Sequence, residues 1–134
     1  MATRVFISFK AENKPNVDGL RLLAKNPNYD LEFYDESVRA PIDSTNATYI
    51  KSRIREKIQR AGVALCLVDT DTHTSAWVDW ELRTAIELGK PIVAMAIKGL
   101  TEAVVPAPIR GKVHFYSWDP ASLQSVMEGA QKVT

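Results

Sequence analysis

The chain has 134 residues, of which 46% are hydrophobic and 25% are charged, values typical of a folded globular protein and not of a disordered one. This length suits a single domain, residues 1–134, built around one core. Lys and Arg total 17 and Asp and Glu total 16, so the net charge is +1. A dedicated nucleic-acid binder is usually clearly basic, and this balance argues against one.

The small numbers of cysteines and histidines limit the disulfide and metal sites that the chain can form. Cys66 is the only cysteine, which excludes an internal disulfide and a thiolate zinc cluster. His73 and His114 are the only histidines and lack a metal-ligand spacing, so we expect no metal. No apolar run approaches membrane-spanning length, and the opening MATRVFISF lacks the pattern of a signal peptide. We therefore expect a cytoplasmic protein with no membrane partner.

The first half of the chain alternates between strand and helix patterns. Residues 4–9 (RVFISF) are β-branched and aromatic, which predicts a strand. Apolar residues with helical spacing follow at 17–25, and a short second strand is expected at 31–34. After a polar loop, residues 45–60 place isoleucines at every fourth position, which predicts an amphipathic helix. Gly62 is expected to end that helix as glycines commonly do.

The second half continues the alternation. Residues 63–68 are apolar throughout, as in a strand covered on both faces. A polar loop at 69–75 leads to a helix at 76–88, which Gly89 is expected to end. The remaining predicted elements are a buried strand at 91–97, an edge strand at 113–116 and a helix at 121–132.

Five strands alternating with helices predict an α/β fold with a parallel sheet covered on both faces. At this size the expected architecture is a flavodoxin-like, doubly wound five-stranded sheet with strand order 2-1-3-4-5. In such sheets ligands bind beyond the carboxyl ends of the strands, near the switch point between strands 1 and 3. The residues expected around that crevice are Phe9, Lys10, Asp35, Glu36 and the segment 69–77.

Several functions of flavodoxin-like sheets require residues that are missing here. The first predicted strand leads into SFKAENKPN, which is no glycine-rich phosphate loop, so dinucleotide-fingerprint, P-loop and flavin sites are not expected. A phosphorylated receiver requires an acidic pair after strand 1, where this chain has Ser8, Phe9 and Lys10. We therefore expect no bound cofactor.

The predicted helix at 76–88 has a carboxylate on its apolar side. With Trp77 at zero and about 100° per residue, Glu81 falls near 40°, between Leu88 near 20° and Ala85 near 80°. The remaining arc takes Asp79, Trp80, Arg83, Thr84 and Glu87, with Asp79 and Glu87 on the wet side. An ionised carboxylate is costly to bury unless it is paired or lines a cavity, and Trp77 lies on the same side to wall such a cavity.

Two interpretations of Glu81 follow. In one, the helix rotates slightly and Glu81 lies at the border of the buried face, reaching solvent or pairing with Lys10 or Arg4. In the other, Glu81 is a functional carboxylate, which its place beside the predicted crevice favours. The positive end of the helix would help to keep this carboxylate ionised.

Three segments resemble TIR domains over residues 3–118. RVFISFKAEN is similar to their first strand, SAWVDWEL to the S-x-W-x-x-x-E-L motif of their third helix, and AIELGKPIVAM to their passage into the fourth strand. Among TIR-like proteins, the likeness is greatest to short bacterial ones such as the TIR component of the Thoeris antiphage defence system. The loop YDESVRAPIDSTNA departs from the family's R-D-x-x-P-G-like pattern, so the geometry of any self-association does not carry over.

The resemblance implies a specific activity. In enzymatic members the glutamate of the helix motif cleaves NAD at the nicotinamide–ribose bond, and it corresponds to Glu81. NAD is then a substrate and no cofactor is needed; water attack gives ADP-ribose, and internal attack gives a cyclic ADP-ribose isomer that a separate effector protein reads. The expected substrate-binding residues are Ser8, Phe9, Lys10, Asp35, Ser75 and Trp77. The alternatives are a non-catalytic TIR-like interaction module and a nucleoside deoxyribosyltransferase-like enzyme.

Overall fold

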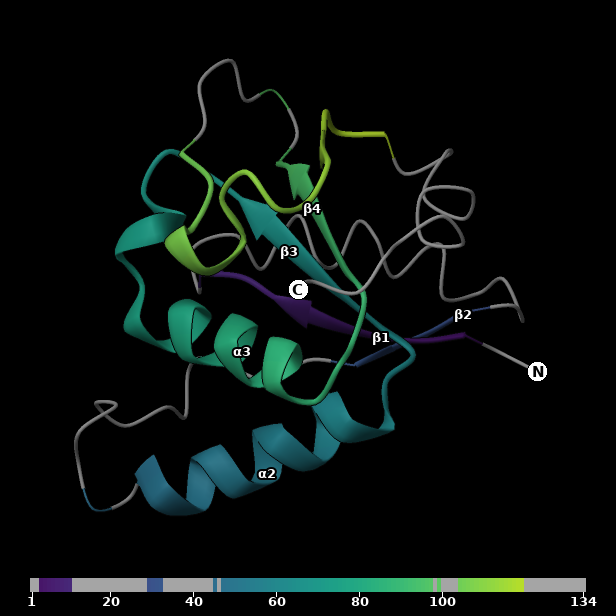
Figure 1. Ribbon diagram of the computed structural model, residues 1–134, viewed down its shortest axis with the longest axis vertical. Coiled ribbons are helices and arrows are strands. Elements are labelled where there is room, and N and C mark those ends of the chain that lie inside the picture. Colours follow the sequence, from purple (N-terminus) through teal and green to yellow (C-terminus); the bar gives the residue numbers. More distant parts are fainter. Residues whose placement is uncertain are drawn as a thin grey trace.

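The computed structural model describes residues 3–10, 29–32, 45, 47–97, 99 and 104–119. In this part of the chain a single parallel sheet has the strand order β2-β1-β3-β4-β5. Figure 1 labels strands β1 to β4. The predicted α/β class is therefore confirmed, and the order is the one expected from the sequence. The predicted helices at 17–25 and 121–132, and Asp35 with the loop YDESVRAPIDSTNA, fall largely or wholly outside the described residues.

The strands follow the predicted segments closely. Their bounds are β1 Thr3–Ser8, β2 Tyr29–Glu32, β3 Val63–Val68, β4 Ile92–Ala96 and β5 Phe115–Tyr116. The prediction for the start of β2 was wrong by two residues, because Tyr29 and Asp30 already pair with Thr3 and Arg4 of β1. Ladder pairing with a neighbouring strand thus overrides the low strand preference of an aspartate.

The described helices also lie where the apolar spacing predicts them. Helix α2 spans Ala47–Arg60 and helix α3 spans Ala76–Glu87. The loop between β3 and α3 contains the short 3₁₀ turn η3, Thr72–Thr74, and a second 3₁₀ turn, η4, spans Ala107–Ile109. The sequence indicated a loop in the first case but not its helical turn, since three residues carry no periodic signal.

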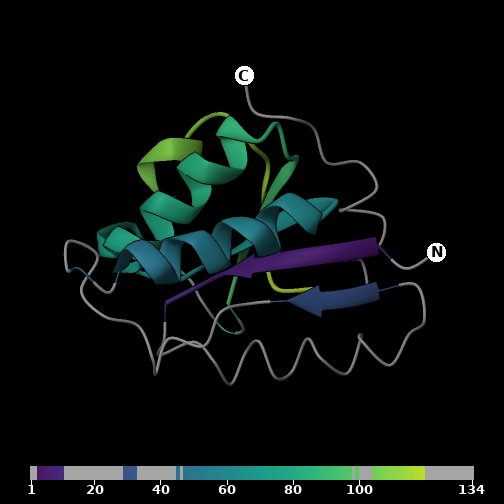
Figure 2. The ribbon, with the colours of Figure 1, turned by 90° about the horizontal axis from the view of Figure 1, so that it is seen from below.

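Side chains of the sheet divide into two apolar layers. Phe6 and Cys66 point to the layer that α2 and α3 cover, together with Ile54 and Leu82 from those helices. Figure 2 shows both helices on the same side of the sheet. The opposite layer contains Val5, Ile7, Phe9, Val63, Leu65, Leu67, Val93 and Met95. Adjacent strand residues point to opposite faces, so the central strands are buried on both sides.

The ends of α3 fix how the helix sits on the sheet. Gly89 has φ +70° and follows the C-cap, and Lys90 N–H donates to the Ala85 carbonyl at 2.9 Å, as in a Schellman motif. The prediction for Gly89 is confirmed. The prediction for Gly62 was wrong: its φ is not positive, and its N–H donates to the Arg4 carbonyl at 2.8 Å. Pairing with β1 therefore sets the backbone after α2.

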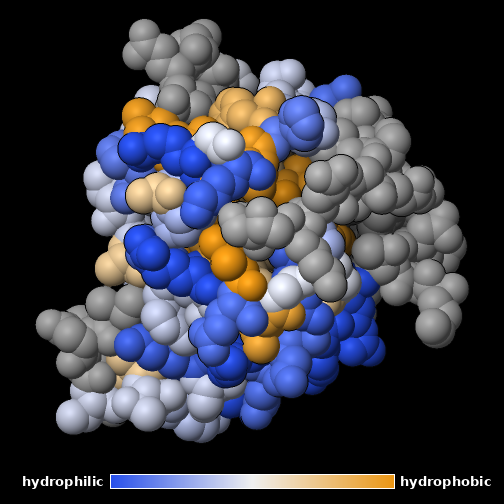
Figure 3. Space-filling model, viewed as in Figure 1, coloured by the Kyte–Doolittle hydropathy of each residue, from blue (hydrophilic) through white to orange (hydrophobic). Residues whose placement is uncertain are grey.

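The surface over α2 and α3 is mixed, with orange apolar patches separated by blue polar ones (Figure 3). Of the large hydrophobic side chains in the described ranges, Tyr49, Val104 and Phe115 are exposed. No helix in those ranges has the length and apolar character needed to cross a membrane.

Candidate active site

Glu81 lies in the middle of α3 on the side that faces the sheet. Its side chain is 1% exposed, in a helix whose buried residues also include Val78, Leu82 and Ala85. The interpretation of Glu81 as a solvent-reaching border residue is therefore wrong. The helix projection placed the carboxylate on the correct side, because the apolar residues that define the arc are the ones that pack.

A serine of the first strand contacts this carboxylate. Ser8, the last residue of β1, donates a hydrogen bond from its Oγ to Oε1 of Glu81 at 2.9 Å. Ser8 is as buried as Glu81, with 1% of its surface exposed. A buried carboxylate is strongly stabilised by hydrogen-bond donors, since it has lost the donors that water would supply. The structure thus brings two of the predicted site residues together.

Cys66 adjoins the same pair. In the β1–β3 register Ser8 lies opposite Cys66, which is fully buried in the layer under α3. Burial raises the pKa of the Cys66 thiol well above 9.0, and the negative charge of Glu81 raises it further. The thiol is therefore neutral at physiological pH and is no nucleophile. Nothing in the sequence marks Cys66 as a site residue, although its position beside strand 1 follows from the strand order.

Two tryptophans flank Glu81 on α3. Trp77 lies one turn before Glu81 and is almost fully buried, and its ring meets that of Trp80 edge to face at a centroid distance of 6.0 Å. Trp80 is half-buried and carries the Lys51 ammonium 5.9 Å from its ring centroid. The placement of Trp77 on the side of Glu81 agrees with the projection.

Thr84 belongs to the arc that the projection left outside the apolar residues. Thr84 is buried, and its hydroxyl donates to the Trp80 carbonyl at 2.8 Å, so its polar group is satisfied within the helix. Helix α3 also contacts α2 and η4, and so buries a wider arc than contact with a sheet alone would require. Asp79 and Arg83, in contrast, form an exposed ion pair at 2.7 Å.

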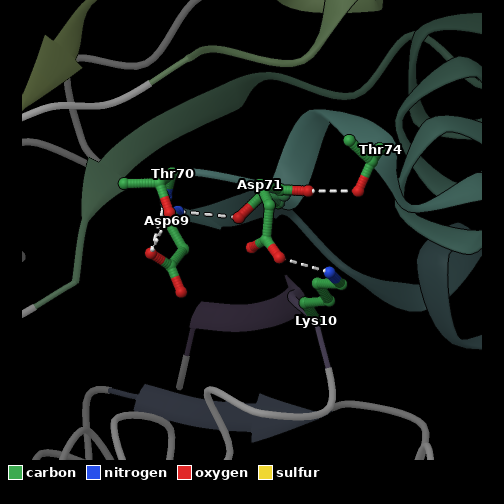
Figure 4. Close-up of polar contacts among 6 residues, drawn as sticks. Lys10, Asp69, Thr70, Asp71 and Thr74 are labelled. Atoms are coloured by element: carbon green, nitrogen blue, oxygen red, sulfur yellow. Dashed lines mark hydrogen bonds and ion pairs between the residues drawn. The ribbon is translucent and has the colours of Figure 1, made fainter.

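The loop from β3 to α3 forms the edge of the site. Thr72 is buried and its Oγ1 accepts a hydrogen bond from the Asp69 N–H at 2.7 Å, which holds the loop closed on itself. The hydroxyl of Thr74 donates to the Asp71 carbonyl at 2.6 Å (Figure 4). These bonds leave the side chain of Asp71 directed toward the end of β1.

An ion pair joins this loop to β1. Lys10 Nζ lies 2.6 Å from Oδ2 of Asp71, and Figure 4 shows the two side chains meeting across the carboxyl edge of the sheet. Hydrogen bonding from Lys10 is the main cause that lowers the pKa of the Asp71 carboxyl below its ordinary value of 3.8. The sequence predicts Lys10 at this edge of the sheet. It does not predict Asp71 as the partner of Lys10, because nothing in a polar loop indicates which aspartate faces inward.

Two of the other predicted site residues, Ser75 and Phe9, have structural roles. Ser75 is the N-cap of α3, and its Oγ accepts from the Val78 N–H at 3.2 Å. Phe9 is buried in the layer on the face opposite α3, so the structure does not bring its ring to Glu81. Asp35 lies outside the described residues. Across the described ranges, no group of three or more His, Cys, Asp or Glu side chains is placed to hold a metal ion.

The arrangement offers one carboxylate, one hydroxyl donor and a neutral thiol in a dry layer, with a lysine–aspartate pair at the nearby strand ends. A carboxylate in low dielectric interacts strongly with positive charge that develops beside it. The geometry suits stabilisation of a cation by a single positioned anion.

Comparison with known proteins identifies the relatives of this chain. Residues 6–102 match the family model described as Thoeris protein ThsB, TIR-like domain. That range contains Ser8, Glu81 and the ion pair between Lys10 and Asp71. A search of curated proteins found no match.

Solved structures share the fold at low sequence identity. A 2-deoxyribosyltransferase from Bacillus psychrosaccharolyticus has a TM-score of 0.66 at 17% identity, covering 91% of this chain and 90% of that one. The CMP N-glycosidase BcmB from Clostridium botulinum has a TM-score of 0.62 at 14% identity, covering 94% and 99%. The TIR domains of the Roq1 resistosome have a TM-score of 0.55 at 18% identity, covering 84% and 65%.

Proposed function

The chain belongs to the family of TIR-like domains of Thoeris protein ThsB, and from this premise we propose that it is an enzyme that cleaves NAD at the nicotinamide–ribose bond. The observation that carries the proposal is the buried carboxylate of Glu81, held by Ser8 on the sheet-facing side of α3. The product would serve as a signalling nucleotide in bacterial antiphage defence.

The reaction suits a single carboxylate. Nicotinamide is cationic while bound to ribose and leaves as a neutral molecule with the electron pair of the broken C–N bond, so no acid is needed to protonate it. The ribose left behind has oxocarbenium character, and its positive charge is what the enzyme must stabilise. Glu81 is the anion that we assign to this role.

Two acceptors can complete the reaction. A water molecule that attacks the ribose carbon loses a proton and gives ADP-ribose. Attack by a nucleophilic group of the same ADP-ribosyl unit gives a cyclic ADP-ribose isomer instead. We propose the cyclic product, since a nucleotide signal can be read by a separate effector protein, and exclusion of water from a buried site favours internal attack.

The structural neighbours support this class of reaction. The names of two of them describe transfer of a deoxyribosyl group and cleavage of an N-glycosidic bond. At 17% and 14% identity they share the fold with this chain, and their chemistry enters here as support for a proposal. Each acts at the carbon of a sugar that bears a nitrogen base, as the proposed reaction does.

The substrate contacts are part of the proposal. We propose that Lys10 meets the diphosphate of NAD and that Trp77 walls the pocket of one base. Asp35 remains our proposal for a ribose hydroxyl. Ser75 and Phe9 have the structural roles of helix cap and core residue, so we assign them no contact with substrate.

Burial of Glu81 has a consequence for activity. With 1% of its side chain exposed, the carboxylate cannot touch NAD until neighbouring groups move. We therefore propose a low basal rate that rises when the protein self-associates, as expected if assembly stabilises an open arrangement.

A nucleoside deoxyribosyltransferase-like activity is the second candidate, favoured by the shared fold with such an enzyme. It differs from the first in needing a nucleoside donor and a free base as acceptor. The third candidate, a non-catalytic interaction module, predicts no turnover of either substrate.

Incubation of the purified chain with NAD, followed by chromatography of the products, tests the proposal. Glu81→Gln removes the charge at constant size, and Glu87→Gln on the exposed side of the same helix is the matched control. We expect nicotinamide release and an ADP-ribose isomer from the wild type and from Glu87→Gln, and neither from Glu81→Gln. Assays should span a wide range of protein concentration, and turnover of deoxynucleosides alone would favour the second candidate.

A further inference from the structure

The contact between Ser8 and Glu81 joins strand β1 to helix α3. Ser8 ends a strand that pairs with β2 and β3, so its backbone position is fixed by the sheet. Glu81 lies on α3, whose start is capped by Ser75 and whose end is closed by Gly89. The hydrogen bond therefore runs from one rigid element to another, at 2.9 Å.

A glutamate needs such a contact if its carboxylate is to have one orientation. The last torsion of a glutamate side chain is broad, so packing of the aliphatic part alone does not define where the two oxygens point. A donor on Oε1 fixes the carboxylate plane and thereby the direction of Oε2. An error of about 1 Å in the position of a reacting group costs on the order of 10²-fold in rate.

The thiol of Cys66 also lies near Glu81, and it is a weaker donor than the hydroxyl of Ser8. Cys66 lies opposite Ser8 in the strand register, and its S–H is neutral and only a weak hydrogen-bond donor. The hydroxyl of Ser8 is a full-strength donor, and it meets Oε1 of Glu81 at 2.9 Å. The bond from Ser8 Oγ to Glu81 Oε1 joins two side chains that are each 1% exposed.

We propose that Ser8 is the positioning residue of the active site: its hydroxyl sets the orientation of the Glu81 carboxylate toward the ribose carbon and does not itself contact the substrate. This inference rests on the proposed NAD-cleaving function and changes the substrate-binding role that the sequence suggested for Ser8. Loss of the hydroxyl lowers kcat, while the affinity for NAD, which depends on other contacts, is retained.

Steady-state kinetics of nicotinamide release from Ser8→Ala and Ser8→Thr test the inference, with Ser52→Ala on the exposed face of α2 as control. We expect Ser8→Ala to lower kcat by about 10- to 100-fold with KM within about twofold of the wild type. Ser8→Thr restores the hydroxyl and recovers most of kcat. If the threonine methyl does not fit, Ser8→Cys, with a weak donor of similar size, gives an intermediate kcat. Thermal unfolding of each variant shows that it is folded.

Crystal structures of the wild type and Ser8→Ala separate a failure of this inference from a failure of the proposed function. If the wild type turns over NAD and Ser8→Ala has an unchanged kcat, or a raised KM alone, the positioning role is overturned and the function stands. If the wild type releases no nicotinamide, the function fails. The structures then decide on Ser8: a rotated Glu81 carboxylate in Ser8→Ala upholds its role, and an unmoved carboxylate refutes it.

Discussion

Ser8 and Glu81 are separated by 73 residues in the sequence and by 2.9 Å in space, from hydroxyl to carboxylate, with both side chains buried. The pair ties the end of β1 to the centre of α3 at the switch point of the sheet, where doubly wound folds bind their ligands. Ser8 and Glu81 have a part in the proposed chemistry, whereas Ser75 and Phe9 stabilise the surrounding fold.

Ser75 provides a stability prediction. As the N-cap of α3, its hydroxyl satisfies the Val78 N–H, and Ser75→Ala is expected to lower the free energy of unfolding by about 1 kcal/mol. Urea unfolding measures this loss, and Ser75→Asp should restore the cap. The KM of the folded enzyme for NAD should not change. A raised KM with unchanged stability would instead make Ser75 a ribose contact.

Phe9 provides a second stability prediction, for the apolar layer on the face of the sheet opposite α3. Its ring is buried in the apolar layer opposite α3, so Phe9→Ala should cost about 3–5 kcal/mol, and Phe9→Leu much less. Chemical denaturation gives these values. Phe9→Leu should retain the KM of the wild type, whereas an aromatic wall for a nucleotide base would lose affinity when the ring is replaced by an aliphatic group.

The ion pair between Lys10 and Asp71 competes with the proposed contact between Lys10 and the diphosphate. Asp71→Asn removes the charge that holds Lys10 across the carboxyl edge, so we expect a lower KM for NAD. Lys10→Gln should raise KM, and added salt should weaken the effect of both changes because the pair is partly exposed. Initial rates measured over a range of NAD concentrations at two ionic strengths give the KM of the wild type and of both variants. Equal KM values in all three proteins would remove Lys10 from the substrate site.

Cys66 makes stability depend on alkaline pH. Its thiol has a raised pKa in the folded protein, so it keeps its proton above pH 9.0 while the thiol of the unfolded chain loses it. The free energy of unfolding should therefore fall as pH rises beyond about 9, by up to about 1.4 kcal/mol per pH unit. Comparison of wild type with Cys66→Ala between pH 7 and 10.5 isolates this slope, since the other alkaline groups titrate in both. Parallel curves would contradict it.

The sequence predicts the framework because the framework depends on short-range patterns. The apolar run of β3, the isoleucine spacing of α2 and the glycine after α3 each report a local requirement for burial or backbone geometry. The side of α3 on which Glu81 lies follows from the same spacing. Where contacts with other elements decide the outcome, the prediction failed, as for the start of β2 and the backbone at Gly62.

The partners of site residues are less predictable than their locations. Strand order places Ser8 next to Cys66, and helix periodicity places Glu81 on the sheet side, but neither pattern specifies the hydrogen bond from Ser8 to Glu81. The choice of Asp71 over Asp69 as the partner of Lys10 depends on how the loop bonds to itself through Thr72. These hydrogen-bond partners depend on how segments tens of residues apart are arranged in space. Short sequence patterns carry no information on that arrangement.

The hydrogen bond between a strand and a helix also bears on how such a protein can diversify. Because the carboxylate is oriented from inside the sheet, replacement of residues along the rim, such as those of the β3–α3 loop, can change which nucleotide is accepted without disturbing the group that acts on the bond. Evolution can then explore new signals by surface substitution while the bond-breaking apparatus is inherited intact. Exchange of rim segments between family members should accordingly transfer product identity more readily than exchange of α3.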